Sequence, residues 1–259
     1  MMENIWKRGT ATRVIPCLDI KGGRVVKGVR FENLVDSGDP GILAARYEAE
    51  GADEIALLDI SATLEERKTA LQAVSSVRAA VSIPISVGGG IRSVEDAERL
   101  LEAGADRVSV NSAAVRNPDL VSRLAQRFGV QCVIVAIDAR RRENTGWEVV
   151  VDAGTTKTGL DAVEWAKTCA RLGAGEILLT SIDRDGTGTG YDVELVGAVA
   201  KASGIPVIAS GGATLPSHFL AGVNAGASAI LGAGAFHRGE LTIKNLKMYL
   251  SEYGVGVRL

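Results

Sequence analysis

The stretch Val14-Ile15-Pro16-Cys17-Leu18-Asp19-Ile20, followed at once by Lys21-Gly22-Gly23, decides the fold of this chain. It is a short apolar run with a carboxylate near its end, and glycines close it. Runs of roughly four to eight apolar residues bounded by turn residues are typical of a buried strand. We therefore predict a strand over residues 14–19, with Asp19 at the point where the strand ends and its loop begins.

The same pattern returns in the second half of the chain as Val133-Ile134-Val135-Ala136-Ile137-Asp138-Ala139-Arg140. Asp19 and Asp138 lie 119 residues apart, close to half of the 259-residue chain. A second pair of matching stretches, residues 83–90 (IPISVGGG) and 205–212 (IPVIASGG), recurs at about the same spacing. Two halves built on one plan indicate an internal repeat.

Apolar runs alternate with helical stretches along the chain, and eight strand–helix units are expected. Strict alternation indicates a parallel sheet, and eight units in this length predict a closed (β/α)8 barrel made of two similar half-barrels. An open, doubly wound sheet is the alternative. The expected strands are 14–19, 54–60, 83–87, 107–111, 131–138, 176–180, 205–209 and 227–231. A helix is expected after each strand, one of them beginning at Asn117-Pro118 with proline in its first position.

Composition narrows the class of protein. Hydrophobic residues make up 46% of the chain and the net charge is −2, which favours a globular protein and disfavours a general nucleic-acid binder. No apolar run approaches the roughly 18 residues of a membrane span. Three widely spaced cysteines and two histidines offer neither a paired disulfide framework nor a metal site, so no metal and no cofactor is predicted.

The N-terminus has no apolar signal-peptide core, so a cytoplasmic protein is expected. Residues 1–12 are polar and are expected to form a tail ahead of a single barrel domain over residues 13–259. The loop after the first strand is expected to be long, to contain a small hairpin near residues 23–28, and to run on to Asp39-Pro40. A loop of that length in a compact domain is usually functional.

Glycine-rich turns follow the third and seventh expected strands. Backbone N–H groups of such a turn can approach a phosphate, and a helix N-terminus behind the turn adds a favourable dipole. The neighbouring strands end in Asn111-Ser112 and in Gly232-Ala233-Gly234. The repeat therefore predicts two phosphate sites on opposite sides of one barrel mouth. The alternative is that these glycines only make tight turns.

Asp19 and Asp138 are expected on the first and fifth strands, directly across an eight-stranded ring. Two carboxylates so placed can act as acid at one end of a substrate and as base at the other. A lone aspartate more often caps a helix or pairs with a basic side chain, which is the alternative here. Lys27, in the long first loop, is either a mobile electrostatic contact for the substrate or a solvated lysine.

Four charged residues stand at strand starts, at the opposite end of the expected barrel. Side chains alternate along a strand, so Arg13 points inward if Asp19 does. Charges that enter a barrel base are costly unless they are paired, and two arginines with two glutamates can neutralise one another. The simplest interpretation is a structural ring of salt bridges. Its members are Arg13, Glu54, Arg107 and Glu176.

Long motifs of the sequence resemble the cyclase subunit of imidazole glycerol phosphate synthase, a family of histidine biosynthesis. The resemblance extends over residues 13–259. It is carried by residues 16–28 (PCLDIKGGRVVKG), 31–34 (FENL), 36–40 (DSGDP), 182–187 (IDRDGT) and 209–213 (ASGGA).

The resemblance implies a (β/α)8 barrel that takes ammonia and a bis-phosphorylated formimino carboxamide ribonucleotide. It implies that imidazole glycerol phosphate and aminoimidazole carboxamide ribonucleotide are released. Ammonia would come from a separate glutaminase subunit, which would form a heterodimer with this chain at the barrel base. The four-residue ring would then gate ammonia.

By motif, the resemblance implies that Asp19 is the principal acid or base, that Asp138 is its partner and that Lys27 belongs to a closing loop. One phosphate site would be lined by Gly89, Asn111 and Ser112. The other site and its approach would be lined by Thr180, Asp185, Gly186, Ser210, Gly211, Gly212, Ala233 and Gly234.

Two positions depart from the family pattern. Arg107 stands where lysine is expected, and Gly234 stands where serine is expected, so a backbone N–H must replace a hydroxyl there. Two other functions stay open at this point. The sister isomerase of the pathway shares the half-barrel plan and two phosphate sites, although residues 25–28 and 183–187 speak against it. A non-catalytic phosphate-binding scaffold that activates a partner is the second.

Overall fold

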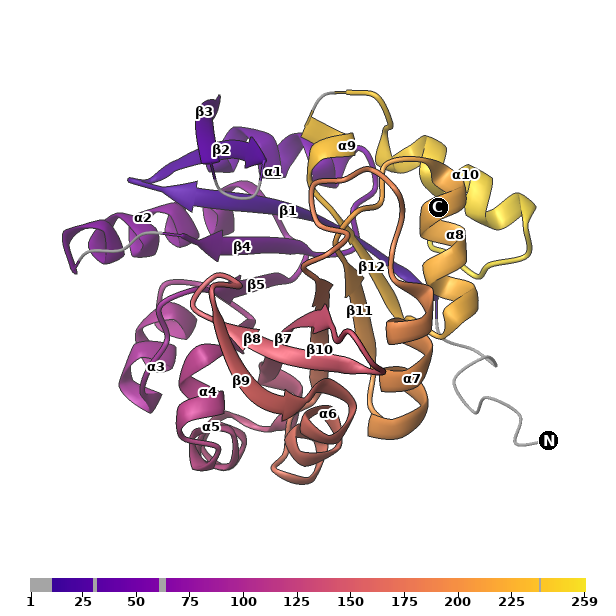
Figure 1. The fold of residues 1–259 in the computed structure, drawn as a ribbon. Coiled ribbons are helices and arrows are strands. Elements are labelled where there is room, and N and C mark those ends of the chain that lie inside the picture. Colours follow the sequence, from indigo (N-terminus) through magenta and orange to yellow (C-terminus); the bar gives the residue numbers. More distant parts are fainter. Residues whose placement is uncertain (1–10, 30–31, 61–63, 238) are drawn as a thin grey trace.

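Eight parallel strands close into a barrel surrounded by helices in the computed structural model, which describes residues 11–29, 32–60, 64–237 and 239–259 (Figure 1). In chain order they are β1 (Arg13–Lys21), β4 (Ile55–Asp59), β5 (Ile85–Gly88), β6 (Arg107–Val110), β7 (Val133–Arg141), β10 (Glu176–Ser181), β11 (Val207–Ser210) and β12 (Ala229–Gly232). Each pairs with the next, β7 pairs with β10, and β12 returns to pair with β1. This closure confirms the (β/α)8 barrel and excludes the open sheet. All but the last two residues of the expected tail lie outside the described residues.

The helices follow the barrel strands in the expected alternation, with shifts of a few residues at their ends. Side-chain caps fix several of the starts: Asp39 accepts a hydrogen bond from the Ile42 N–H at 3.0 Å, and Ser93 accepts one from the Asp96 N–H at 3.2 Å. The helices are α1 (Pro40–Ala49), α2 (Leu64–Ala80), α3 (Val94–Glu102), α4 (Ser112–Arg116), α5 (Asp119–Phe128), α6 (Ala162–Arg171), α7 (Val193–Ser203), α8 (Pro216–Ala225), α9 (Gly234–His237) and α10 (Ile243–Glu252).

Two local expectations differ from the structure. Pro118 is the N-cap of α5 rather than its first residue, and the short helix α4 precedes it. The hairpin expected near residues 23–28 is present, but it is larger than expected: β2 (Arg24–Val29) pairs with β1, and β3 (Glu32–Gly38) pairs with β2. The second half repeats this excursion, since β8 (Trp147–Val151) pairs with β7 and β9 (Thr156–Asp161) pairs with β8.

The two glycine turns make the same close contact in each half. Gly89 follows β5 with φ +100°, and Gly211 follows β11 with φ +92°. A Cβ on Gly89 would lie 2.0 Å from the carbonyl oxygen of Asp59, at the end of the preceding strand. A Cβ on Gly211 would lie 2.8 Å from the equivalent oxygen of Ser181. The turns therefore need glycine for conformation and for space, and the repeat seen in the sequence is a repeat in structure.

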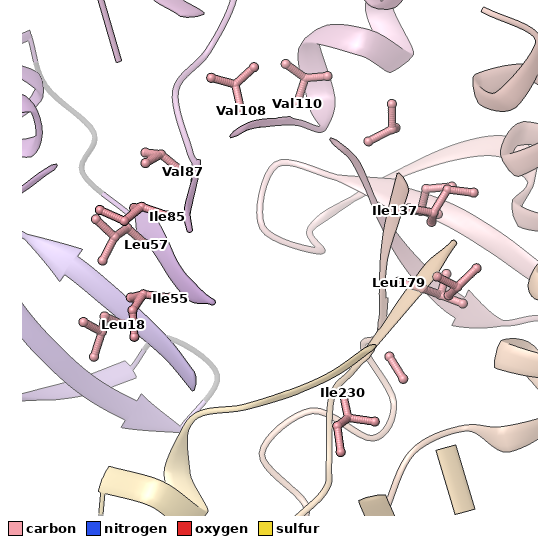
Figure 2. Packing of buried hydrophobic residues seen from close by; sticks show 14 of the residues in the cluster. Leu18, Ile55, Leu57, Ile85, Val87, Val108, Val110, Ile137, Leu179 and Ile230 are labelled. Carbon is pink, nitrogen blue, oxygen red and sulfur yellow. The ribbon is translucent and has the colours of Figure 1, made fainter. Parts of the chain in front are cut away.

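The apolar core has two layers, because alternate residues of each barrel strand face inward and outward. Outward residues pack against the helices, and Figure 2 shows part of this layer, with Leu18, Ile55 and Leu57 close together. The inward layer is smaller and includes Ile15, Cys17, Ile134, Leu178 and Ile208. Among the described residues, no helix has both the length and the apolar character needed to cross a bilayer.

Replacing Gly89 with alanine should lower the free energy of unfolding by more than about 3 kcal/mol, because the new Cβ would displace the Asp59 carbonyl. Gly159 is the matched control: its φ is +78°, but a Cβ there meets nothing within 4 Å. Gly159→Ala should cost only about 1 kcal/mol, the conformational cost alone. Urea unfolding of both variants measures the difference, and equal losses would contradict the packing argument.

Candidate active site

Asp19 and Asp138 lie on opposite sides of the barrel mouth. Three strands separate β1 from β7 in either direction around the ring. Both carboxylates follow inward-facing residues of their strands, Cys17 and Ile134, and both are partly exposed above a buried apolar layer. The Cys17 Sγ lies 3.9 Å from Asp19 Oδ1. The aspartates were predicted at the strand ends, but β1 continues to Lys21 and β7 to Arg141, because both strands extend beyond the barrel into antiparallel pairs with β2 and β8.

Asp138 has an environment suited to proton transfer. Desolvation inside the barrel raises its pKa to about 6; a hydrogen bond from Asn111 opposes the rise, and the nearby Asp185 carboxylate adds to it. The Asn111 Nδ2 donates to Asp138 Oδ2 at 2.8 Å. A carboxyl group with this pKa can give or take a proton near neutral pH.

Asn111 therefore has a contact that sequence analysis missed, since the residue was expected only in a phosphate site. Its amide orients Asp138 from the adjacent strand end. The other amide atom, Oδ1, is buried and has no hydrogen-bond partner among the described residues. The signal in the sequence was the position of Asn111, one strand before Asp138, which the barrel order makes a neighbour.

The first glycine turn lies beside Ser112, the first residue of α4. The Ser112 Oγ accepts a hydrogen bond from the Asp152 backbone N–H at 3.1 Å, so its own hydrogen is directed elsewhere and can be donated to an anion. The Arg116 Nη2 lies 2.6 Å from Oδ1 of the same residue, Asp152. The tip between β8 and β9 thus braces this side of the mouth, a contact that no local motif indicated.

The second glycine turn is covered by the polar loop that follows β10. The Gly190 N–H donates a hydrogen bond to the Gly212 carbonyl at 2.9 Å. The Asp185 backbone N–H donates one to the Ser181 carbonyl at 2.9 Å. Thr180 lies in register with Ser210 on one side and with Asp138 on the other. The predicted members of this site are therefore brought together from three strand ends. They are Thr180, Asp185, Gly186, Ser210, Gly211, Gly212, Ala233 and Gly234.

Lys27 is the predicted site residue for which the structure gives only the backbone. It lies in β2, one residue beyond the pair formed by Asp19 and Val26, and in register with Val35. Its side chain lies outside the described part of the chain, so its role stays a prediction.

The four charged residues at the other end form a closed ring. Arg13 contacts both Glu54 and Glu176. The Arg107 Nη1 lies 2.6 Å from Glu176 and 3.6 Å from Glu54. Burial disfavours the charged guanidinium of Arg13, but the two glutamates outweigh it and raise the Arg13 pKa. Both carboxylates are almost fully buried, and Glu54 Oε1 has no hydrogen-bond partner among the described residues.

Comparison with known proteins gives a consistent result. The family model described as "Histidine biosynthesis protein" matches residues 13–242. The imidazole glycerol phosphate synthase subunit HisF of Metallosphaera sedula is 58% identical over 250 residues, which are 96% of this chain and 99% of that protein. The subunit of the same name from Dehalococcoides mccartyi is 58% identical over 248 residues, 95% of this chain and 98% of that protein.

Asp138→Asn should stabilise the protein at neutral pH. The Asp138 pKa is about 6 in the native state and 3.8 in the unfolded chain. The free energy of unfolding therefore falls as pH rises from about 4 to about 6, because the unfolded chain ionises this group more readily than the native protein does. The gain in the free energy of unfolding should be small at pH 4 and reach about 3 kcal/mol at pH 8.

Asp152→Asn is the control with the opposite sign, because Arg116 lowers the Asp152 pKa and the native pair is favourable above it. Denaturant unfolding between pH 4 and pH 8 measures both variants. A gain for Asp138→Asn that does not grow with pH would show that its carboxyl group ionises normally.

Proposed function

The chain belongs to the histidine biosynthesis protein family and is a cyclase subunit of imidazole glycerol phosphate synthase; we propose that Asp19 and Asp138 perform its acid–base chemistry. The observation that carries the proposal is their placement. The two carboxylates lie across the barrel mouth, between two matched glycine turns.

The substrate we assign has a phosphate at each end, which suits a mouth with one glycine turn on each side. Backbone N–H groups at Gly89 and the hydroxyl of Ser112 would hold one phosphate. The turn at residues 210–212 and the start of α9 at Gly234 would hold the other, with backbone N–H groups because glycine brings no hydroxyl. The reacting part of the substrate would then lie between Asp19 and Asp138.

Joining ammonia to the linear substrate and releasing two products requires protons to move at several nitrogen and oxygen atoms. Asp138 can exchange a proton near neutral pH because its pKa is about 6. Asn111 holds one oxygen of that carboxyl group, which fixes its orientation. Asp19, on the other side, would serve the opposite end of the reacting group.

We assign the charged ring at the barrel base to the passage of ammonia. The relatives are named as subunits, which supports a multi-subunit synthase, and a glutaminase docked at the base would deliver ammonia there. The ring closes the floor by four ion pairs that must part for a molecule to pass. Arg107 presents a planar fork and binds its glutamates more rigidly than lysine would.

Asp19→Asn should lower the rate of ribonucleotide turnover with ammonium salt, in the absence of partner, by at least roughly 100-fold, because shape is kept and proton exchange is lost. Asp106→Asn is the control. Asp106 lies at the barrel base, away from the mouth, where its Oδ2 accepts a hydrogen bond from the Ile85 N–H at 2.8 Å. Ammonia-independent conversion of the ribonucleotide would contradict the cyclase reaction, and full turnover by a folded Asp19→Asn protein would show that another group performs the proton transfer.

Arg107→Met should change glutamine-dependent turnover, measured with the glutaminase partner, more than turnover with free ammonia, because only the first requires a controlled passage through the ring. Arg78→Met is the control, since Arg78 pairs with Asp106 at 3.1 Å, has a similar exposure and lies on α2 outside the barrel. Equal effects of Arg107→Met on the two assays would reduce the ring to a structural feature.

A further inference from the structure

Two partly buried hydrogen bonds join α1, α9 and β1. The Tyr47 hydroxyl, on α1, lies 2.7 Å from His237 Nδ1. The His237 Nε2, at the end of α9, lies 3.0 Å from the Cys17 carbonyl oxygen on β1. Tyr47 is fully buried, and no step of the proposed reaction uses any of these groups.

The partners define the proton positions in these two hydrogen bonds. A carbonyl oxygen can only accept, so His237 Nε2 carries the hydrogen and donates it to Cys17. In a neutral imidazole, His237 Nδ1 is then the acceptor for the Tyr47 hydroxyl. Burial raises the pKa of Tyr47 to about 12, with only partial opposition from Arg46, so the phenol keeps the hydrogen that it donates.

These two hydrogen bonds lie at the point where the strand ladder between β1 and β12 stops. Their last paired residues are Pro16 and Gly232. Cys17 to Ile20 pair with β4, which lies along the other edge of β1, and Asp19 to Lys21 pair with β2. His237 bonds the Cys17 carbonyl just beyond the last pair with β12. The His237 side chain therefore links α9 to β1 between Pro16, the last residue paired with β12, and Asp19, the first residue paired with β2.

Aromatic side chains pack closely around Tyr47 and α9. Phe236 packs edge-on against Tyr47 with ring centroids 6.4 Å apart, and it stacks on Phe219 at 5.8 Å. The Arg46 guanidinium lies 4.7 Å from the centre of the Tyr47 ring and donates to the Phe236 carbonyl at 3.4 Å. Movement of α9 is therefore transmitted to His237 rather than absorbed by loose packing.

We propose that Tyr47 and His237 are positioning residues that set Asp19 relative to the second phosphate turn. α9 is a single turn: Gly234 begins it, at the phosphate site, and His237 ends it. Cys17 lies two residues before Asp19, and its Sγ is 3.9 Å from that carboxylate. A phosphate that seats α9 thereby fixes the strand end that presents Asp19. This inference rests on the proposed function.

The kinetic test uses Tyr47→Phe, which removes one hydroxyl and leaves the ring packing. Turnover number with saturating ammonium salt should fall by about 10-fold, and the KM for the ribonucleotide should change by less than about 3-fold, because Asp19 is misplaced while phosphate contacts remain. His237→Ala should have at least the same effect. His237→Gln should restore part of the rate, since its amide N–H can still donate to Cys17.

Tyr191→Phe is the matched control. The Tyr191 hydroxyl is also buried and donates at 2.7 Å to the Leu231 carbonyl, so its hydrogen bond is to β12 and not to His237. Because each variant loses one phenol hydrogen bond, Tyr191→Phe should lower thermal stability as much as Tyr47→Phe does. The turnover number of Tyr191→Phe should stay near that of the native protein. If the two tyrosine variants have equal turnover numbers, the positioning role is overturned.

A second measurement needs no turnover. Inorganic phosphate should slow hydrogen exchange of the backbone amides of residues 18–21 in the native protein and in Tyr191→Phe, but not in His237→Ala. Equal protection in all three proteins would overturn the inference. The proposed function fails by a separate result, namely a native protein without ammonia-dependent turnover or an Asp19→Asn variant that retains it.

Discussion

The interior of an eight-stranded barrel admits only every second residue of each strand, and this limit organises the whole molecule. Along β1 the inward residues are Arg13, Ile15, Cys17 and Asp19. The interior therefore has a charged base, an apolar middle and a carboxylate at the mouth. The apolar layer separates the two polar ends, and the charges of the base pair with one another. Neutral ammonia can cross such a layer at lower cost than ammonium can.

The two half-barrels share a scaffold but give their aspartates different neighbours. Asp138 on β7 adjoins the end of β6, where Asn111 donates a hydrogen bond to it. Asp19 on β1 adjoins the end of β12, where the equivalent residue is Ala233 and has no side-chain donor. A repeated scaffold thus provides two carboxylates in two environments. Distinct environments are how one enzyme assigns distinct proton-transfer roles to identical side chains.

Most of the barrel could be predicted from local sequence, because a short apolar run between glycines has few alternatives to a buried strand. The misses fell where local sequence is ambiguous. Residues 32–38 are polar enough to suggest a loop, and they form a strand only because β2 lies beside them. Pro118 is favourable at the first position of a helix, but α4 had already taken the preceding residues.

The sequence by itself determined the order of the barrel strands, the repeat of the two halves and the alternation that points Arg13 and Asp19 into the same interior, because these follow from periodicity along the chain. Only the tertiary structure decided which side chains from different strands contact one another. Asn111 meets Asp138 over 27 residues, and His237 meets Cys17 over 220. Such contacts depend on how the ring closes, and no spacing of residues along the chain encodes the distance between two strand ends in space.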